Sequence, residues 1–180
     1  MTTLRVCVWD RAVRVLHWVL VGSVALSALG LVALFGVHQP AGYVALAVVA
    51  VRVAWGCFGS RYARFGQFVR APRAAWRYAL AVAQHREPRY LGHNPLGGWM
   101  AVALLACVAG LALTGWLYTT DAFWGDAAVE RVHRALAWAL LALVVTHLAG
   151  VLFTSLRQRE NLVAAMLDGR KRAPAADDVV

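Results

Sequence analysis

Charged side chains are scarce in this sequence. Asp, Glu, Lys and Arg make up 15% of its 180 residues, whereas 61% of the residues are hydrophobic and the mean hydropathy is +0.60. A soluble globular domain has about a quarter of its residues charged. The shortage of charge therefore argues against a soluble protein and predicts an integral membrane protein.

Cysteine is also rare, and the three that are present have neither a disulfide nor a metal-ligand spacing. Cys7 precedes the first apolar stretch, and Cys57 and Cys107 fall in or beside later ones. We interpret all three as packing or surface thiols.

Four long stretches of the chain contain almost no charge. They cover residues 13–37, 41–58, 97–119 and 132–154, each close to the roughly 20 residues that a helix needs to cross the hydrocarbon core. No small-residue cleavage site closes the first stretch, so we expect it to remain as a helix. Short connections and the lack of an internal repeat favour an all-α, antiparallel four-helix bundle that forms a single membrane domain over residues 1–180.

Acidic residues number only nine, against eighteen basic ones, and the net charge of +9 is unevenly distributed. Arginines concentrate before the first apolar stretch, in the connection 59–96 and after the fourth stretch, whereas the turn 37–41 has none. The connection 119–131 is mildly acidic. The positive-inside rule then predicts that the N- and C-termini are cytoplasmic. This distribution accounts for the charge without a nucleic-acid partner.

Two shorter segments outside the apolar stretches are predicted to be helical. Residues 72–84 combine arginine with aromatic residues, as expected for a basic helix in the lipid interface. Apolar residues within 156–169 recur at roughly helical spacing and predict a surface helix. The rest of the segment 156–180 ends in RAPAADDVV, which we expect to be a frayed tail.

Two histidines interrupt the fourth apolar stretch. His133 and His147 are fourteen residues apart, so they leave a helix within about 40° of the same side and about 21 Å apart along its axis. With a cytoplasmic N-terminus, His17 lies near the inner face of the membrane and His38 near the outer face. The four histidines therefore make two level pairs, His17 with His147 and His38 with His133.

Two imidazoles at one depth are too few for a zinc site, which needs four ligands or three and an open position. A haem supplies four nitrogens itself and needs only two axial ligands and apolar walls. We therefore predict two b-type haems, each with its iron between one pair of histidines. The alternative is that each histidine only makes a polar contact between helices.

Three arginines are candidates for binding haem propionates. Arg52 is fourteen residues after His38, so it projects from the same side of its helix at the depth of the inner haem. Arg14 is near His17, and Arg134 is next to His133. For Arg14 and Arg134, contact with lipid phosphates is an equally good interpretation.

Several segments resemble the bacterial cytochrome b561 and nickel-iron hydrogenase b-type cytochrome family. They are WDRAVRVLHW (9–18), the segment 38–65 that begins HQPAGYV, YLGHNPLGG (90–98), the His133/His147 pair and RQRENLVAAMLDGRKR (157–172). The resemblance covers about residues 9–172. It implies a four-helix core with two b haems, whose axial ligands correspond to His17, His38, His133 and His147. It also implies a location in a bacterial inner membrane, electron exchange with membrane quinone, and often a partner redox protein.

Two features differ from the family pattern. Hydrogenase-associated members are commonly longer than 180 residues, which weighs against a hydrogenase partner. Pro40 follows His38 closely, so this ligand lies in the first turn of its helix, where proline is tolerated.

The motif GHNP (92–95) precedes the third apolar stretch. His93 is expected at the inner interface, where its imidazole can bond a quinone head group and move the accompanying proton. The alternative is a helix-capping loop, with Asn94 as the cap and Pro95 as the first helical residue.

The favoured function is electron transfer between membrane quinone and a redox protein, such as a c-type cytochrome or a dehydrogenase subunit. Irons with both axial positions filled relay electrons and do not bind substrate. A second hypothesis is a stand-alone superoxide:quinone oxidoreductase, in which Arg131 and Arg134 attract the anion. A third is a haem-free membrane anchor subunit. Under each of the three hypotheses the chain contacts membrane lipid, either as a monomer or as a homodimer.

Overall fold

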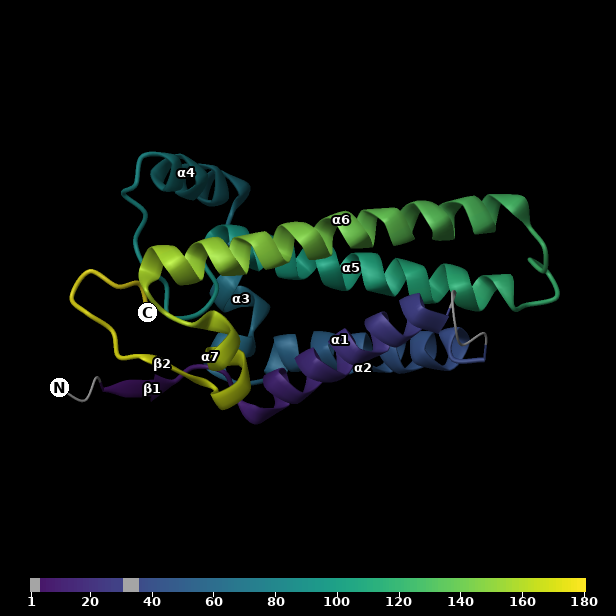
Figure 1. Cartoon of the computed structure of the whole chain (residues 1–180), viewed down its shortest axis with the longest axis horizontal. Helices are drawn as coiled ribbons and strands as arrows, with labels where there is room; N and C mark the ends of the chain where they lie inside the picture. The colour runs from purple at the N-terminus through teal and green to yellow at the C-terminus, as the bar shows by residue number, and fades with distance from the viewer. Residues whose placement is uncertain (1–3, 31–35) are drawn as a thin grey trace. The chain divides into compact units, whose positions relative to one another are not determined.

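Four long helices dominate the computed structural model, which describes residues 4–30 and 36–180 (Figure 1). They are α1 (Arg11–Gly30), α2 (His38–Phe58), α5 (Pro95–Tyr118) and α6 (Ala127–Gln158). Each is long and apolar enough to cross a membrane. The prediction of an all-α chain with four apolar spans is confirmed. Residues 31–35 of the first expected span lie outside the described residues.

Shorter elements connect or follow these helices. They are β1 (Arg5–Cys7), the 3-10 helix η1 (Arg61–Ala63), α3 (Phe65–Phe68), α4 (Pro72–Ala83), α7 (Leu162–Asp168) and β2 (Arg170–Arg172). The helix expected at 72–84 is confirmed as α4. The helix expected at 156–169 is only partly correct, because α6 continues to Gln158 and is broken at Arg159, whose φ is +50°. A new helix, α7, starts after Asn161, whose side chain accepts a hydrogen bond from the Ala164 N–H at 2.9 Å.

The internal contacts of the chain divide it into two compact units. The first, which we call the helical unit, contains Val15–Val53 and Ala103–Val145. The second, which we call the terminal unit, contains Met1–Arg14, Ala54–Val102 and Thr146–Val180. Each long helix contributes residues to both units.

The core of the helical unit is a cluster of apolar side chains from all four long helices. These are Leu20 and Val24 of α1, Ala45 and Val49 of α2, Cys107 and Val108 of α5, and Leu136 and Leu140 of α6. Cys107 is buried and donates from its thiol to the Leu136 carbonyl at 3.4 Å. The expected role of Cys107 as a packing thiol is confirmed.

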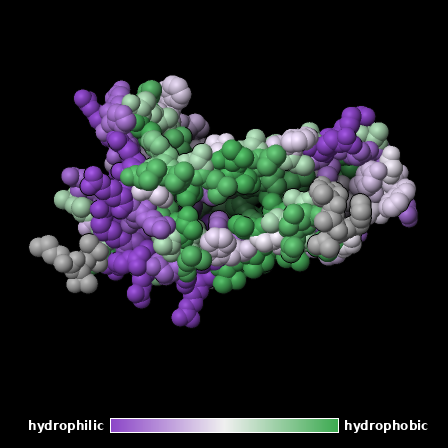
Figure 2. Space-filling model, viewed as in Figure 1, coloured by the Kyte–Doolittle hydropathy of each residue, from purple (hydrophilic) through white to green (hydrophobic). Residues whose placement is uncertain are grey.

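The outward faces of the same helices are apolar as well. Leu26, Val51, Leu113 and Val145 keep between 46% and 59% of their surface exposed. Figure 2 shows hydrophobic residues gathered along the long helices and hydrophilic ones near their ends. Such a surface is unfavourable in water and matches the hydrocarbon core of a bilayer, where a helix satisfies its own backbone groups.

A two-stranded sheet joins the two ends of the chain in the terminal unit. β1 and β2 pair antiparallel, with Val6 opposite Lys171 (Figure 1). At the end of α7, Gly169 adopts a φ of +81°, and a Cβ there would lie 2.6 Å from the Trp9 carbonyl. Glycine is therefore required where β2 begins, for both its conformation and its lack of a side chain.

The last residues of the chain are held in place in the terminal unit. The Arg89 guanidinium donates to Glu160 at 2.9 Å and forms an ion pair with Asp178. The Val179 N–H donates to the Arg89 carbonyl at 2.8 Å, and the Leu91 N–H donates to the Val179 carbonyl at 3.0 Å. The expectation of a frayed tail is therefore wrong, because charged partners distant in the sequence bind this segment.

Candidate metal centre

His38 and His133 lie side by side in the helical unit. His38 is the first residue of α2, and His133 is in the second turn of α6. Their ring centroids are 6.1 Å apart, and the ring planes meet at 73°. The structure thus brings together the two histidines that the sequence predicts to form the outer pair.

The Nδ1 atom of each of these rings is hydrogen bonded to a neighbouring helix. His38 Nδ1 is 2.8 Å from the carbonyl oxygen of Ser27, which can only accept. His133 Nδ1 is 2.9 Å from the hydroxyl oxygen of Thr114. That hydroxyl donates to the Gly110 carbonyl at 2.8 Å, so it accepts from the imidazole. Both rings therefore carry their proton on Nδ1, and each Nε2 has a lone pair for a metal.

Sequence reasoning did not identify Ser27 and Thr114, the groups that bind the Nδ1 atoms. Both are hydroxyl residues inside apolar stretches, at the depth expected for the outer histidines. That depth was the signal by which Thr114 could have been found. Ser27 acts through its backbone carbonyl, which any residue has, so no side-chain pattern could have indicated it.

Close packing also shapes the surroundings of His133. A Cβ at Gly115 would lie 3.3 Å from His133 Cε1, tighter than an ordinary contact between carbon atoms. The absence of a side chain at Gly115 therefore gives the imidazole its room.

The inner histidines are half-buried. His17 belongs to the helical unit, where its ring meets that of Trp18 edge-on at 5.2 Å. His147 is on the part of α6 that belongs to the terminal unit. Because the two residues fall in different units, their pairing stays a prediction.

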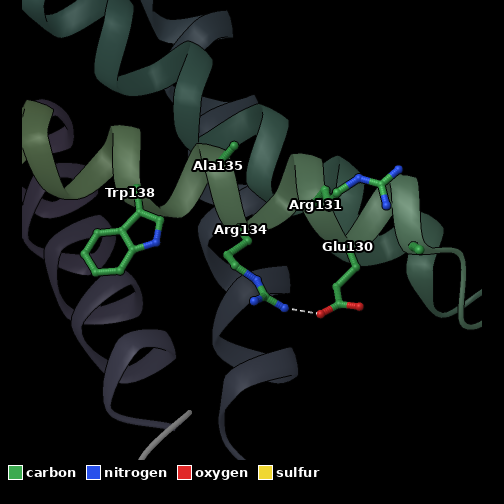
Figure 3. A pocket seen from close by; sticks show the side chains of 6 residues that line it. Glu130, Arg131, Arg134, Ala135 and Trp138 are labelled. Carbon is green, nitrogen blue, oxygen red and sulfur yellow. Dashed lines mark hydrogen bonds and ion pairs between the residues drawn. The ribbon is translucent and has the colours of Figure 1, made fainter.

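The three predicted propionate ligands differ in their surroundings. Arg52 is buried in the helical unit, with 9% of its surface exposed. Arg14 donates to the Leu167 carbonyl in the terminal unit. Arg134 forms an ion pair with Glu130 one helical turn away, on the exposed face of α6 (Figure 3). A role in binding propionates stays a prediction for all three.

The Arg134–Glu130 pair lies along a shallow groove on the outward face of α6. Its lining residues are Ala127, Glu130, Arg131, Arg134, Ala135 and Trp138. Figure 3 shows Trp138 and Arg134 on the same face of this helix. Glu130 therefore offsets one of the two positive charges in the groove.

His93 is held between two aromatic rings in the terminal unit. Its ring centroid is 4.8 Å from that of Trp9 and 4.6 Å from that of Phe68. The neighbouring Asn94 accepts a hydrogen bond from the Gly97 N–H at 2.7 Å, and α5 begins at Pro95. The capping interpretation of GHNP is confirmed for Asn94 and Pro95. The role of His93 as a quinone ligand stays a prediction.

A metal site made of protein ligands alone finds no support in the described part of the chain. Within residues 4–30 and 36–180, His, Cys, Asp and Glu side chains nowhere gather in threes that could hold an ion. Zinc sites need at least three such ligands. A pair of imidazoles instead matches a metal whose other ligands come from a cofactor.

Comparison with known proteins agrees with this chemistry. Residues 8–169 match the family model of prokaryotic cytochrome b561. A protein of Bradyrhizobium diazoefficiens named "Probable Ni/Fe-hydrogenase B-type cytochrome subunit" is 24% identical over an alignment 163 residues long, gaps included, and the match covers 75% of this chain. The chain spans 65% of that relative's length. No solved structure matches.

The family model covers nearly the whole chain, including all four long helices and the histidines on them. The resemblance seen in the sequence is therefore confirmed, and with it a haem b cofactor and several membrane spans. The chain belongs to the prokaryotic cytochrome b561 family.

Proposed function

We propose that this protein holds two b-type haems and passes electrons between membrane quinone and a redox protein. The observation that carries the proposal is the separation of 6.1 Å between the His38 and His133 ring centroids. A metal–imidazole bond is about 2 Å long, so two such bonds in line, together with the two ring radii, span roughly 6 Å. The observed separation supports an iron that both imidazoles would hold.

The hydrogen bonds of the two imidazoles support the same assignment. Ser27 and Thr114 fix the proton on Nδ1, which orients each ring and raises the basicity of Nε2. A haem bound here would supply an iron that gains and loses one electron. The protein would hold both axial positions, and the helices would keep water away from the iron.

For the second haem we propose His17 and His147 as axial ligands. Arg52 is buried in the same unit as His17, and a guanidinium inside an apolar helix favours contact with an anion. Haem propionates are carboxylates, which arginine binds through two parallel hydrogen bonds. We assign Arg14 and Arg134 a smaller part, because each already binds a protein group.

Quinone chemistry would take place at the cytoplasmic face of an inner membrane, with both termini on that side. We propose that His93 donates a hydrogen bond to the quinone head group and moves its proton. The rings of Trp9 and Phe68 fix the imidazole plane. A flat head group would find an aromatic environment there.

The redox partner would be a c-type cytochrome or a dehydrogenase subunit. The Bradyrhizobium relative carries the name of a hydrogenase subunit, and it is longer than this chain. From this relative we take only the proposal that the present chain exchanges electrons with a partner protein. The mildly acidic connection 119–131 offers a basic partner a docking surface on the outer side.

Two alternatives receive less support. A haem-free anchor disagrees with membership of a b-type cytochrome family. Attraction of superoxide by Arg131 and Arg134 is weakened, because Glu130 neutralises Arg134.

Reduction of the purified protein under anaerobic conditions tests the proposal. Decylubiquinol should reduce the haem, and His93→Gln should slow that reduction while leaving the visible spectrum unchanged. Equal reduction rates in the two proteins would rule out His93 as the quinone ligand. Reduction by superoxide with none by quinol would favour the stand-alone oxidoreductase.

A further inference from the structure

Helix α4 has two chemically different faces. Tyr78 is 6% exposed, and its ring meets that of Tyr90 edge-on at 5.6 Å, so this face packs on the terminal unit. The opposite face carries Arg73 and, about one turn later, the neighbouring residues Trp76 and Arg77. Trp76 is 67% exposed.

The outward face of α4 is also positively charged. Pro72, Arg73, Trp76 and Arg77 line one groove. Among the residues that the structure describes, no carboxylate lies within ion-pair distance of Arg73 or Arg77. By contrast, Arg89 pairs with carboxylates inside the same unit.

The position of α4 in the chain confines it to one membrane face. It lies between α2 and α5, two helices that are apolar enough to cross the membrane. An exposed indole close to two exposed guanidiniums is typical of a helix that lies in the headgroup region of a membrane. In the headgroup region, the indole enters the boundary with the acyl chains and the guanidiniums reach phosphate oxygens.

We infer that the groove of Arg73, Trp76 and Arg77 binds the headgroup phosphate of an anionic phospholipid. Two guanidiniums without a carboxylate partner favour a lipid with net negative charge over a zwitterionic one. The indole of Trp76, which lines the same groove, packs against the acyl region of the same lipid. This inference is independent of the haem ligands.

Lipid retention by the full-length protein tests the inference. The protein is equilibrated in mild detergent with equimolar phosphatidylglycerol and phosphatidylcholine, and the retained lipids are quantified by mass spectrometry. Wild type should retain phosphatidylglycerol preferentially. Arg73→Gln with Arg77→Gln should lower that preference by roughly fivefold for each arginine. Glycerol 3-phosphate should not displace the lipid, because it lacks the acyl chains.

A matched control removes two other exposed arginines, Arg11→Gln with Arg86→Gln. Neither of these arginines lines the groove on α4. An equal loss in this control would overturn the inference, since it would reflect overall charge. No preference in the wild type, or displacement by glycerol 3-phosphate, would also overturn it. Size-exclusion profiles show whether each variant is folded.

Brominated acyl chains give a second readout. Quenching of total tryptophan fluorescence by lipids brominated near the headgroup should be smaller in Trp76→Phe than in wild type. Unchanged quenching would show that Trp76 faces water or a protein partner, which would contradict the proposed lipid site.

Discussion

Thr114 accepts a hydrogen bond from Nδ1 of His133 at 2.9 Å and donates its own hydroxyl proton to the Gly110 carbonyl at 2.8 Å. The chain of bonds runs from α6 to the backbone of α5. It fixes both the orientation and the tautomer of an imidazole that we propose as a haem ligand. Thr114 is therefore a positioning residue, which acts on the iron only through His133.

Thr114→Val should raise the midpoint potential of one haem by tens of millivolts. Loss of an acceptor worth about 1 kcal/mol makes Nε2 a weaker donor, which stabilises the ferric iron less. Thr114→Ser keeps the hydroxyl and should restore the wild-type potential. A spectroelectrochemical titration measures both haems together. A shift of equal size in the serine variant would mean that packing, and not the hydrogen bond, sets the potential.

The outer histidine pair was predictable because helix geometry relates residue number to depth. Fourteen residues separate His133 from His147, and alternate orientation of the spans brings His38 to the level of His133. The anchored C-terminus was not predictable, because Arg89 binds Glu160 and Asp178, which are distant in the sequence. The strand β2 was not predictable either, because its sequence RKR is typical of a solvent-exposed basic segment.

Arg89→Met should loosen the C-terminal segment and lower the free energy of unfolding by about 3–5 kcal/mol. It leaves the carboxylates of Glu160 and Asp178, each 8% exposed, without their shared cation. Thermal unfolding and digestion by carboxypeptidase measure the two effects. Arg5→Met is the control, because the Arg5–Asp168 pair is exposed and should contribute less than about 1 kcal/mol. Equal effects in the two variants would contradict a special role for the buried network.

Lys171 predicts an unusual dependence of stability on pH. Burial lowers the pKa of its ammonium group to about 8 from an ordinary 10.5, and the charge of Arg89 lowers the pKa further, while Glu160 opposes the change. At pH values between about 8 and 10.5, the Lys171 side chain keeps its proton in the unfolded chain but has lost it in the folded chain. The contribution of Lys171 to stability therefore rises as pH increases from about 8 to 10.5 and is constant below that window.

Lys171→Met should remove this rise and stabilise the protein at pH 7 by up to roughly 3 kcal/mol. The methionine side chain should keep the apolar contact with the Trp9 ring, whose centroid lies 5.6 Å from the ammonium nitrogen of Lys171. Melting temperatures of both proteins between pH 7 and 10.5 provide the comparison. A wild-type profile parallel to that of the variant would show that Lys171 does not titrate in this range.

The proposal that His38 and His133 hold one iron between them is tested most directly by the haem-to-protein ratio together with reduced-minus-oxidised spectra. Wild type should contain two b haems per chain. His38→Ala, His133→Ala and the double variant should each retain one haem and lose the same spectral component, whereas His17→Ala should lose the other. Loss of different components in the two single variants, or loss of both haems only in the double variant, would contradict the pairing.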